Sequence, residues 1–126
     1  KYDTIPHMVL RQKLVDLGDL PYYKAIEKEL HGMGSVLDIG CGNHKVPGAI
    51  GLDFIKIPGV DEVHDLNKFP YPFEDNSFDI IYANQVLEHL EPELDDILKE
   101  LCRICKPGGK IKIIVPAILF FIRLLL

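Results

Sequence analysis

The chain has 126 residues, which is the length expected of one folding domain. Hydrophobic residues make up 48% and charged residues 26%, which excludes a disordered, collagen-like or extended coiled-coil chain. The 14 Lys and Arg residues against 19 Asp and Glu residues give a formal net charge of -5. This balance disfavours non-specific nucleic-acid binding, because such binding needs clustered basic side chains that neutralise phosphates.

The cysteines and the two ends of the chain predict its surroundings. Cys41, Cys102 and Cys105 are an odd number without the spacing of a disulfide framework, which predicts a reducing compartment and a cytoplasmic protein. No signal peptide is recognised at the start. Residues 117–126, AILFFIRLLL, are almost wholly apolar but shorter than the roughly 20 residues of a membrane span. Because chain ends are usually polar and exposed, this ending suggests a fragment.

Two helices are expected before residue 35, and both would cover a sheet. The first follows Pro6, repeats apolar residues from Met8 to Leu17 and stops at Gly18. The second follows Asp19 as its N-cap and stops at Gly32.

The remainder of the chain alternates between strands and helices. Short apolar runs bounded by turn residues predict five strands, at 35–39, 49–54, 60–64, 78–83 and 110–115. Apolar residues recur at helical spacing from Leu94 to Cys105 and stop at Lys106-Pro107-Gly108-Gly109. This order predicts an α/β fold with an open, mostly parallel sheet and flanking helices.

The first of these strands ends in the glycine loop Gly40-Cys41-Gly42, the feature on which a functional prediction depends. Ligands of open α/β sheets bind at the carboxyl ends of the strands, and glycines there let the backbone approach closely. Asp53 ends the next strand, where a carboxylate can accept hydrogen bonds from ribose hydroxyls. Lys45 replaces the third glycine of a dinucleotide-binding loop, so NAD ranks second.

Four segments in this order resemble the motifs of class I S-adenosylmethionine-dependent methyltransferases, in particular the small type-11-like branch. They are VLDIGCG, GLDF, HDLNKFPYPFEDNSFDIIYANQVLEHL and ELCRICKPGGKIKIIVP, and they lie within residues 35–116. The resemblance implies a Rossmann-like sheet that binds S-adenosylmethionine at the tips of its first four strands and releases S-adenosylhomocysteine. The motif positions assign ten cofactor-binding residues: Asp38, Gly40, Cys41 and Gly42 beneath the methionine part, Asp53 and Phe54 at the ribose, Asp65 and Leu66 facing the adenine, and Asn84 and Gln85 beside the amino-acid portion.

The chemistry of this cofactor agrees with the residues. S-adenosylmethionine carries a sulfonium cation, which suits carboxylates and carbonyl groups, whereas a phosphate would need donors and positive charge. Methyl transfer depends mainly on positioning, and an acid or base helps only if the acceptor carries a proton. His89, which follows the fourth strand, is the candidate for that base, the alternative being that it only shapes the start of a helix.

Two departures from the family pattern are evident. Residues 43–49 and 55–59 are too few for full helical crossovers, so turns are expected there, with a more open cofactor site. We expect the final two strands of the family, its C-terminal hairpin, to be absent. We expect 117–126 either to cover the sheet as a helix or to form a homodimer contact over the exposed sheet edge.

Cys102 and Cys105 have C-x-x-C spacing, but they lie within the amphipathic helix, which favours core packing over metal binding or redox chemistry. No metal site is predicted.

The sequence therefore predicts a single domain with N-terminal helices in 1–34, a cofactor-binding core in 35–116 and a hydrophobic segment in 117–126. Its predicted function is S-adenosylmethionine-dependent methyl transfer to an unidentified acceptor, with a small molecule favoured. The alternatives are a non-catalytic adenosyl-binding or scaffold domain, and then an NAD-type oxidoreductase.

Overall fold

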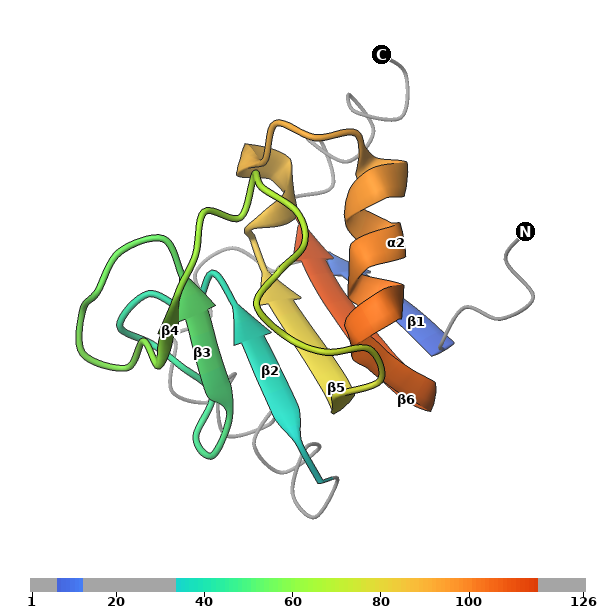
Figure 1. The fold of residues 1–126 in the computed structure, drawn as a ribbon, viewed down its shortest axis with the longest axis horizontal. Helices are drawn as coiled ribbons and strands as arrows, with labels where there is room; N and C mark the ends of the chain where they lie inside the picture. The colour runs from blue at the N-terminus through green and yellow to red at the C-terminus, as the bar shows by residue number, and fades with distance from the viewer. Residues whose placement is uncertain (1–6, 13–33, 116–126) are drawn as a thin grey trace.

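The computed structural model describes residues 7–12 and 34–115, which form one open sheet with a helix packed on it (Figure 1). The six strands have the order β1-β6-β5-β2-β3-β4, and every pair of neighbours is parallel. In chain order the elements are β1 (His7–Gln12), β2 (Val36–Ile39), β3 (Ile50–Asp53), β4 (Glu62–Val63), β5 (Phe78–Asn84), the 3-10 helix η1 (Leu87–His89), α2 (Leu94–Ile104) and β6 (Cys105–Val115).

The predicted α/β, Rossmann-like class is confirmed. Each of the five predicted strands is present, as β2 to β6, and the predicted periodic helix is α2. β6 is longer than predicted, because it begins directly after α2 at Cys105 and includes the Pro107-Gly108-Gly109 segment expected to be a turn. Phe78 pairs with Cys105 and Ile80 with Lys110, and the shift in register between these pairs takes up the extra residues.

The helix predicted after Pro6 is wrong where the structure describes it. His7–Gln12 is the strand β1, which pairs along β6 from His7 opposite Lys110 to Gln12 opposite Val115. Short apolar runs fit a helix or a buried strand equally well, and here the edge of β6 supplies backbone partners for the whole run. The edge expected to lie open beside β6 is therefore covered by β1. The second predicted helix and the segment 117–126 lie outside the described residues, so self-association through that segment stays a prediction.

The core is built by alternation along the strands, which buries both faces of the sheet as parallel sheets require. One face packs against α2 and the segment 64–77 that leads into β5, and it collects Leu37, Ile39, Ile81, Ala83, Ile111 and Ile113. The opposite face carries Val36, Ile80, Tyr82 and Ile114. From α2, the side chains of Ile97, Leu101 and Ile104 are fully buried, and each contributes roughly 1.5–3 kcal/mol of hydrophobic stabilisation.

Both predicted short crossovers contain turns and no helix. Residues 40–49 join β2 to β3, and residues 54–61 join β3 to β4. The first crossover is held by side chains instead: the Asp38 carboxylate accepts the Val46 N–H at 2.8 Å, and the Lys45 ammonium pairs with Asp61 at 2.9 Å. The short path keeps β2 and β3 adjacent, which places their carboxyl ends side by side.

Candidate functional site

A cavity of about 660 Å³ opens at the carboxyl ends of the strands. The loops after β2, β3, β4 and β5 line it, through Gly40, Asp53, Phe54, Asp65, Leu66, Asn67, Gln85, Val86, His89 and Leu90. This position follows from the topology, because consecutive parallel strands bring their following loops to one edge of the sheet.

A second, smaller cavity of about 140 Å³ lies over the glycine loop. Its lining residues are Asp38, Gly40, Cys41, Gly42, Asn43, His44, Tyr82 and Asn84. Gly40 lines both cavities, so the larger and the smaller cavity meet at the end of β2.

The structure brings the residues assigned from the sequence together around these two cavities. Of these residues, the larger cavity is lined by Gly40, Asp53, Phe54, Asp65, Leu66, Gln85 and His89. The smaller cavity is lined by Asp38, Gly40, Cys41, Gly42 and Asn84. Sequence reasoning missed Asn67, Val86, Leu90, Asn43 and Tyr82 as lining residues. Asn67 carried a usable signal, because it follows Asp65 at the spacing of an Asx turn and donates its N–H to Asp65 Oδ1 at 3.0 Å.

The glycine loop depends on Gly40 for close packing. Gly40 has a φ of 65°, and a Cβ placed there would lie 2.5 Å from Cγ2 of Val86. Gly42 has a φ of 54°, but a Cβ there would meet nothing within 4 Å. Gly40 is therefore needed for both conformation and space, whereas Gly42 is needed for conformation alone.

Cys41, between these glycines, is buried beneath the loop. Its thiol donates weakly to the Gly59 carbonyl at 3.9 Å. Burial raises the pKa of Cys41 to about 11, so the side chain is a neutral thiol at physiological pH. Its contribution is packing, and it supplies no thiolate to the site.

The Asp53 carboxylate is fixed by two backbone groups. Its Oδ2 accepts the Gly42 N–H at 2.8 Å and its Oδ1 accepts the Phe54 N–H at 2.7 Å. Each carboxylate oxygen has two lone pairs, so one on each remains for a ligand hydroxyl. Phe54 follows directly, is 65% exposed and lines the same cavity.

Asp38 is a buried acid at the smaller cavity and is only 2% exposed. Burial raises the pKa of Asp38 from 3.8 to about 7, although the Val46 N–H and the charge of Lys45 act in the opposite direction. The carboxyl group is therefore poised to respond to a cation placed beside it, which would favour its ionised form.

The last residue of β5, Asn84, carries an unpaired acceptor among the described residues. Asn84 Oδ1 is buried and finds no hydrogen-bond partner among the described residues. The next residue, Gln85, has a φ of 53° and donates its N–H to the Ile114 carbonyl at 2.6 Å. A buried amide oxygen without a donor is costly, which points to a donor supplied by a ligand in the smaller cavity.

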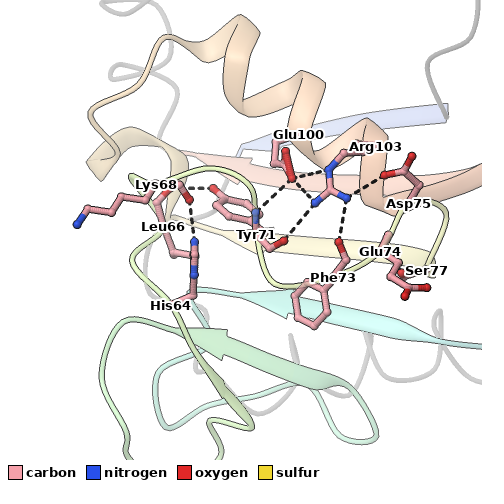
Figure 2. A network of polar contacts seen from close by, with 10 residues as sticks. All are labelled: His64, Leu66, Lys68, Tyr71, Phe73, Glu74, Asp75, Ser77, Glu100 and Arg103. Carbon is pink, nitrogen blue, oxygen red and sulfur yellow. Dashed lines mark hydrogen bonds and ion pairs between the residues drawn. The ribbon is translucent and has the colours of Figure 1, made fainter.

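Asp65, Leu66 and Asn67 form one wall of the larger cavity, and neighbouring segments support this wall from behind. Tyr71 donates its hydroxyl to the Leu66 carbonyl at 2.9 Å (Figure 2). Asn67 Oδ1 accepts the Glu91 N–H at 2.8 Å, which ties this wall to the segment after η1. Both bonds connect stretches of chain that enclose the cavity.

His89 ends η1 and reaches the larger cavity with a side chain that is 74% exposed. Its Nε2 lies 3.6 Å from Oε1 of Glu88, whose side chain is 7% exposed. A histidine at the mouth of a cavity, next to a carboxylate, is placed to accept a proton from a bound molecule.

Taken together, the lining groups suit a cationic ligand that donates hydrogen bonds. Asp38, Asp53 and Asp65 contribute carboxylates, and no Lys or Arg is among the described residues that line either cavity. The Gly42 N–H, which a phosphate-binding loop would present to its anion, is engaged by Asp53. This arrangement does not fit the pyrophosphate of a dinucleotide.

No group of three His, Cys, Asp or Glu side chains in the described part of the chain is placed to hold a metal ion. Burial raises the pKa of Cys105 to about 11 and also raises that of Cys102, which argues against a reactive thiolate pair. Within 7–12 and 34–115, no helix is both long enough and apolar enough to cross a membrane.

Comparison with known proteins bears directly on the class of this site. The family described as a methyltransferase domain matches residues 56–113. A demethylmenaquinone methyltransferase from Shouchella clausii is 30% identical over 90 residues, covering 69% of this chain and 37% of that protein. A sterol 4-C-methyltransferase from Caenorhabditis elegans is 51% identical over 39 residues, covering 31% of this chain and 11% of that protein.

Solved structures agree in fold. The crystal structure of an S-adenosylmethionine-dependent methyltransferase from Mesorhizobium loti superposes with a TM-score of 0.53 at 23% identity, covering 72% of this chain and 49% of that one. The chain resembles S-adenosylmethionine-dependent methyltransferases in sequence and in fold. The predicted resemblance to this family and the predicted fold class are thereby confirmed.

These matches cover only part of each related protein. The chain spans less than half of the length of the curated methyltransferases that it matches. The methyltransferase family match begins at residue 56, after the glycine loop and after Asp53. Cofactor roles for Asp38, Gly40 and Asp53 therefore depend on the geometry of the two cavities.

Proposed function

We propose that this chain binds S-adenosylmethionine across the larger and smaller cavities and directs its methyl group to a small-molecule acceptor. One observation carries the proposal: acceptor oxygens of Asp53, Asp38 and Asn84 gather at the carboxyl ends of β3, β2 and β5, around cavities whose described lining contains no Lys or Arg. That set of atoms matches a ligand with hydroxyl and ammonium donors and a positive charge.

The ribose end of the cofactor fits the larger cavity. Asp53 is already oriented by the Gly42 and Phe54 N–H groups and keeps one lone pair on each oxygen for the two ribose hydroxyls. Phe54 offers an exposed ring beside it, and Asp65 and Leu66 line the opposite wall where an adenine ring would lie.

The methionine end fits the smaller cavity. An ammonium group there would donate to Asn84 Oδ1, which otherwise has no partner among the described residues, and would favour the ionised form of Asp38. Gly40 and Gly42 allow the backbone to pass close to the ligand without a side chain in the way.

Bound S-adenosylmethionine supplies a methyl group activated by its sulfonium. The residues of the chain contribute binding and alignment, which supply most of the acceleration when a reacting group is already activated. Where the acceptor loses a proton, His89 is the group that we propose receives it, with Glu88 beside it.

A small-molecule acceptor is favoured by the names of related proteins, which refer to sterol and to demethylmenaquinone. We also propose a cytoplasmic location, which is supported by the free thiols of Cys41, Cys102 and Cys105.

A second function, binding of the cofactor without catalysis, has one observation in its favour. The crossover 40–49 lacks a helix, so no helix N-terminus reinforces the glycine loop, and most residues that line the larger cavity lie in loops. This alternative predicts adenosyl-compound binding without methyl transfer to any acceptor.

Calorimetric titration with S-adenosylmethionine, S-adenosylhomocysteine and NAD tests the proposal. We expect both adenosyl compounds to bind and NAD to fail. Asp53→Ala should weaken binding by about 1.5–3 kcal/mol, the contribution of hydrogen bonds to a charged group. Asp96→Ala is the matched control, because Asp96 is an exposed acid in the first turn of α2, outside both cavities.

The outcomes separate the alternatives. Failure of both adenosyl compounds to bind at millimolar concentration would overturn the proposed function. Equal weakening by Asp53→Ala and Asp96→Ala would show that only overall charge matters and that the ribose assignment is wrong. Binding of NAD in preference to S-adenosylhomocysteine would restore the oxidoreductase alternative.

A further inference from the structure

Arg103, in the last turn of α2, makes an extensive set of polar contacts outside the two cavities (Figure 2). Its Nε donates to Glu100 Oε1 at 2.7 Å, and its Nη2 also contacts that oxygen. Its Nη1 donates to the Phe73 carbonyl at 2.8 Å and to Asp75 Oδ1 at 2.9 Å, and its Nη2 donates to the Tyr71 carbonyl at 3.2 Å. One guanidinium thus holds three residues of segment 64–77 against α2.

Arg103 lies at the opposite end of the sheet from the two cavities. α2 ends where β6 begins, at the amino ends of the strands, whereas both cavities lie at the carboxyl ends. Segment 64–77 runs from one end to the other, because Asp65, Leu66 and Asn67 line the larger cavity and Ser77 leads into β5. The segment that Arg103 holds is therefore the one that continues into the wall at Asp65, Leu66 and Asn67.

Tyr71 connects the two ends. Its N–H donates to Glu100 Oε1 at 3.3 Å, and its carbonyl accepts from Arg103. Its hydroxyl donates to the Leu66 carbonyl at 2.9 Å. Tyr71 is 2% exposed and Leu66 5% exposed, so water cannot readily replace this bond. Burial raises the pKa of Tyr71, which keeps its hydroxyl protonated as a donor.

We propose that Arg103, acting through Tyr71, is a positioning residue that holds the wall at Asp65 and Leu66 in its ligand-binding geometry. The affinity part of this inference rests on the proposed function, whereas the effect on the wall does not. The guanidinium is required for its shape, because a planar fork with five donors can satisfy two carbonyls and two carboxylates together. A lysine ammonium has the charge but neither the plane nor the number of donors.

Two conservative variants test the inference. Arg103→Lys keeps the charge and removes the fork, and Tyr71→Phe removes only the hydroxyl that reaches Leu66. Lys106→Gln is the control, because it removes a half-exposed ion pair with Asp79, at 3.2 Å, from the same end of the sheet without touching segment 64–77. Should Arg103→Lys fail to fold, Tyr71→Phe alone decides the result.

The first measurement is amide hydrogen exchange of the ligand-free proteins. We expect exchange across 64–73 to be about tenfold faster in Arg103→Lys and Tyr71→Phe, with β5 and β6 unchanged and Lys106→Gln like the wild type. Unchanged exchange in 64–73, or an equal increase across the whole chain, would overturn the inference, because either shows no local support of the wall.

The second measurement is calorimetric titration with S-adenosylhomocysteine at a temperature where every variant is folded. We expect each single variant to raise the dissociation constant roughly threefold to tenfold, as loss of one buried hydrogen bond does. The double variant should have a dissociation constant no higher than that of the single variant with the larger loss. Unchanged affinity, or fully additive losses, would overturn the role of Tyr71 as the connection. If the wild type binds no adenosyl compound while hydrogen exchange responds as expected, the proposed function fails and the support of the wall stands.

Discussion

Replacing Asp38 with Asn should stabilise the ligand-free protein, and more so at higher pH. Unfolded chains ionise aspartate near 3.8, whereas burial raises the pKa of Asp38 in the folded state to about 7. Between these values the folded state holds a proton that the unfolded state has lost, so the free energy of unfolding falls as pH rises through this window. The amide oxygen of the introduced asparagine would still accept the Val46 N–H, which Asp38 now accepts at 2.8 Å, without carrying a buried charge.

The size of the effect follows from the two pKa values. At about 1.4 kcal/mol per pKa unit, the penalty that Asp38 imposes is complete above neutral pH and reaches an upper limit of about 4 kcal/mol. At pH 5 less than half of this penalty is present, because the pH is only about one unit above the pKa of the aspartate in the unfolded chain. The gain from Asp38→Asn should therefore be larger at pH 8 than at pH 5 by up to about 2.5 kcal/mol.

Urea unfolding followed by circular dichroism at pH 5 and pH 8 measures this difference, with exposed Asp96→Asn as the control. The reasoning is refuted if Asp38→Asn gains the same stability at both pH values or loses stability at pH 8. A linked result concerns binding. Because a cation beside Asp38 favours its ionised form, S-adenosylmethionine should bind the wild type more tightly at pH 8 than at pH 6, and Asp38→Asn should lack this dependence.

Two further predictions concern the loop and the core. Gly40→Ala should cost about 2–4 kcal/mol of stability and abolish adenosyl binding, because the added Cβ would overlap Val86. Gly42→Ala should cost only about 1–2 kcal/mol, the penalty for an alanine in the left-handed backbone conformation. Urea titration ranks the two, and equal losses would contradict the packing argument. Leu101→Ala should cost about 2–5 kcal/mol by leaving a cavity under α2, and partly exposed Leu98→Ala clearly less. Thermal unfolding that ranks these two variants equally would contradict the described core.

Much of the site was predictable because local patterns and chain order determine where strands end. The run before Gly40 and the run before Asp53 indicate two buried strands, and parallel neighbours bring the residues after them to one edge. The period of α2 likewise follows from apolar residues spaced along one face. Asn67 and Val86 were missed because their place at the cavity depends on how loops fold over that edge, which no local period encodes.

By itself, the sequence determined the order of alternating strands and α2, the glycine loop and the carboxylates that follow two of the strands. Only the tertiary structure decided that His7–Gln12 is a strand, because the run has no preference until the edge of β6 offers it backbone partners. The same holds for Asp38 and Arg103. A carboxyl group acquires a shifted pKa only when packing removes its water, and a guanidinium supports a distant wall only when folding brings Tyr71 beside it.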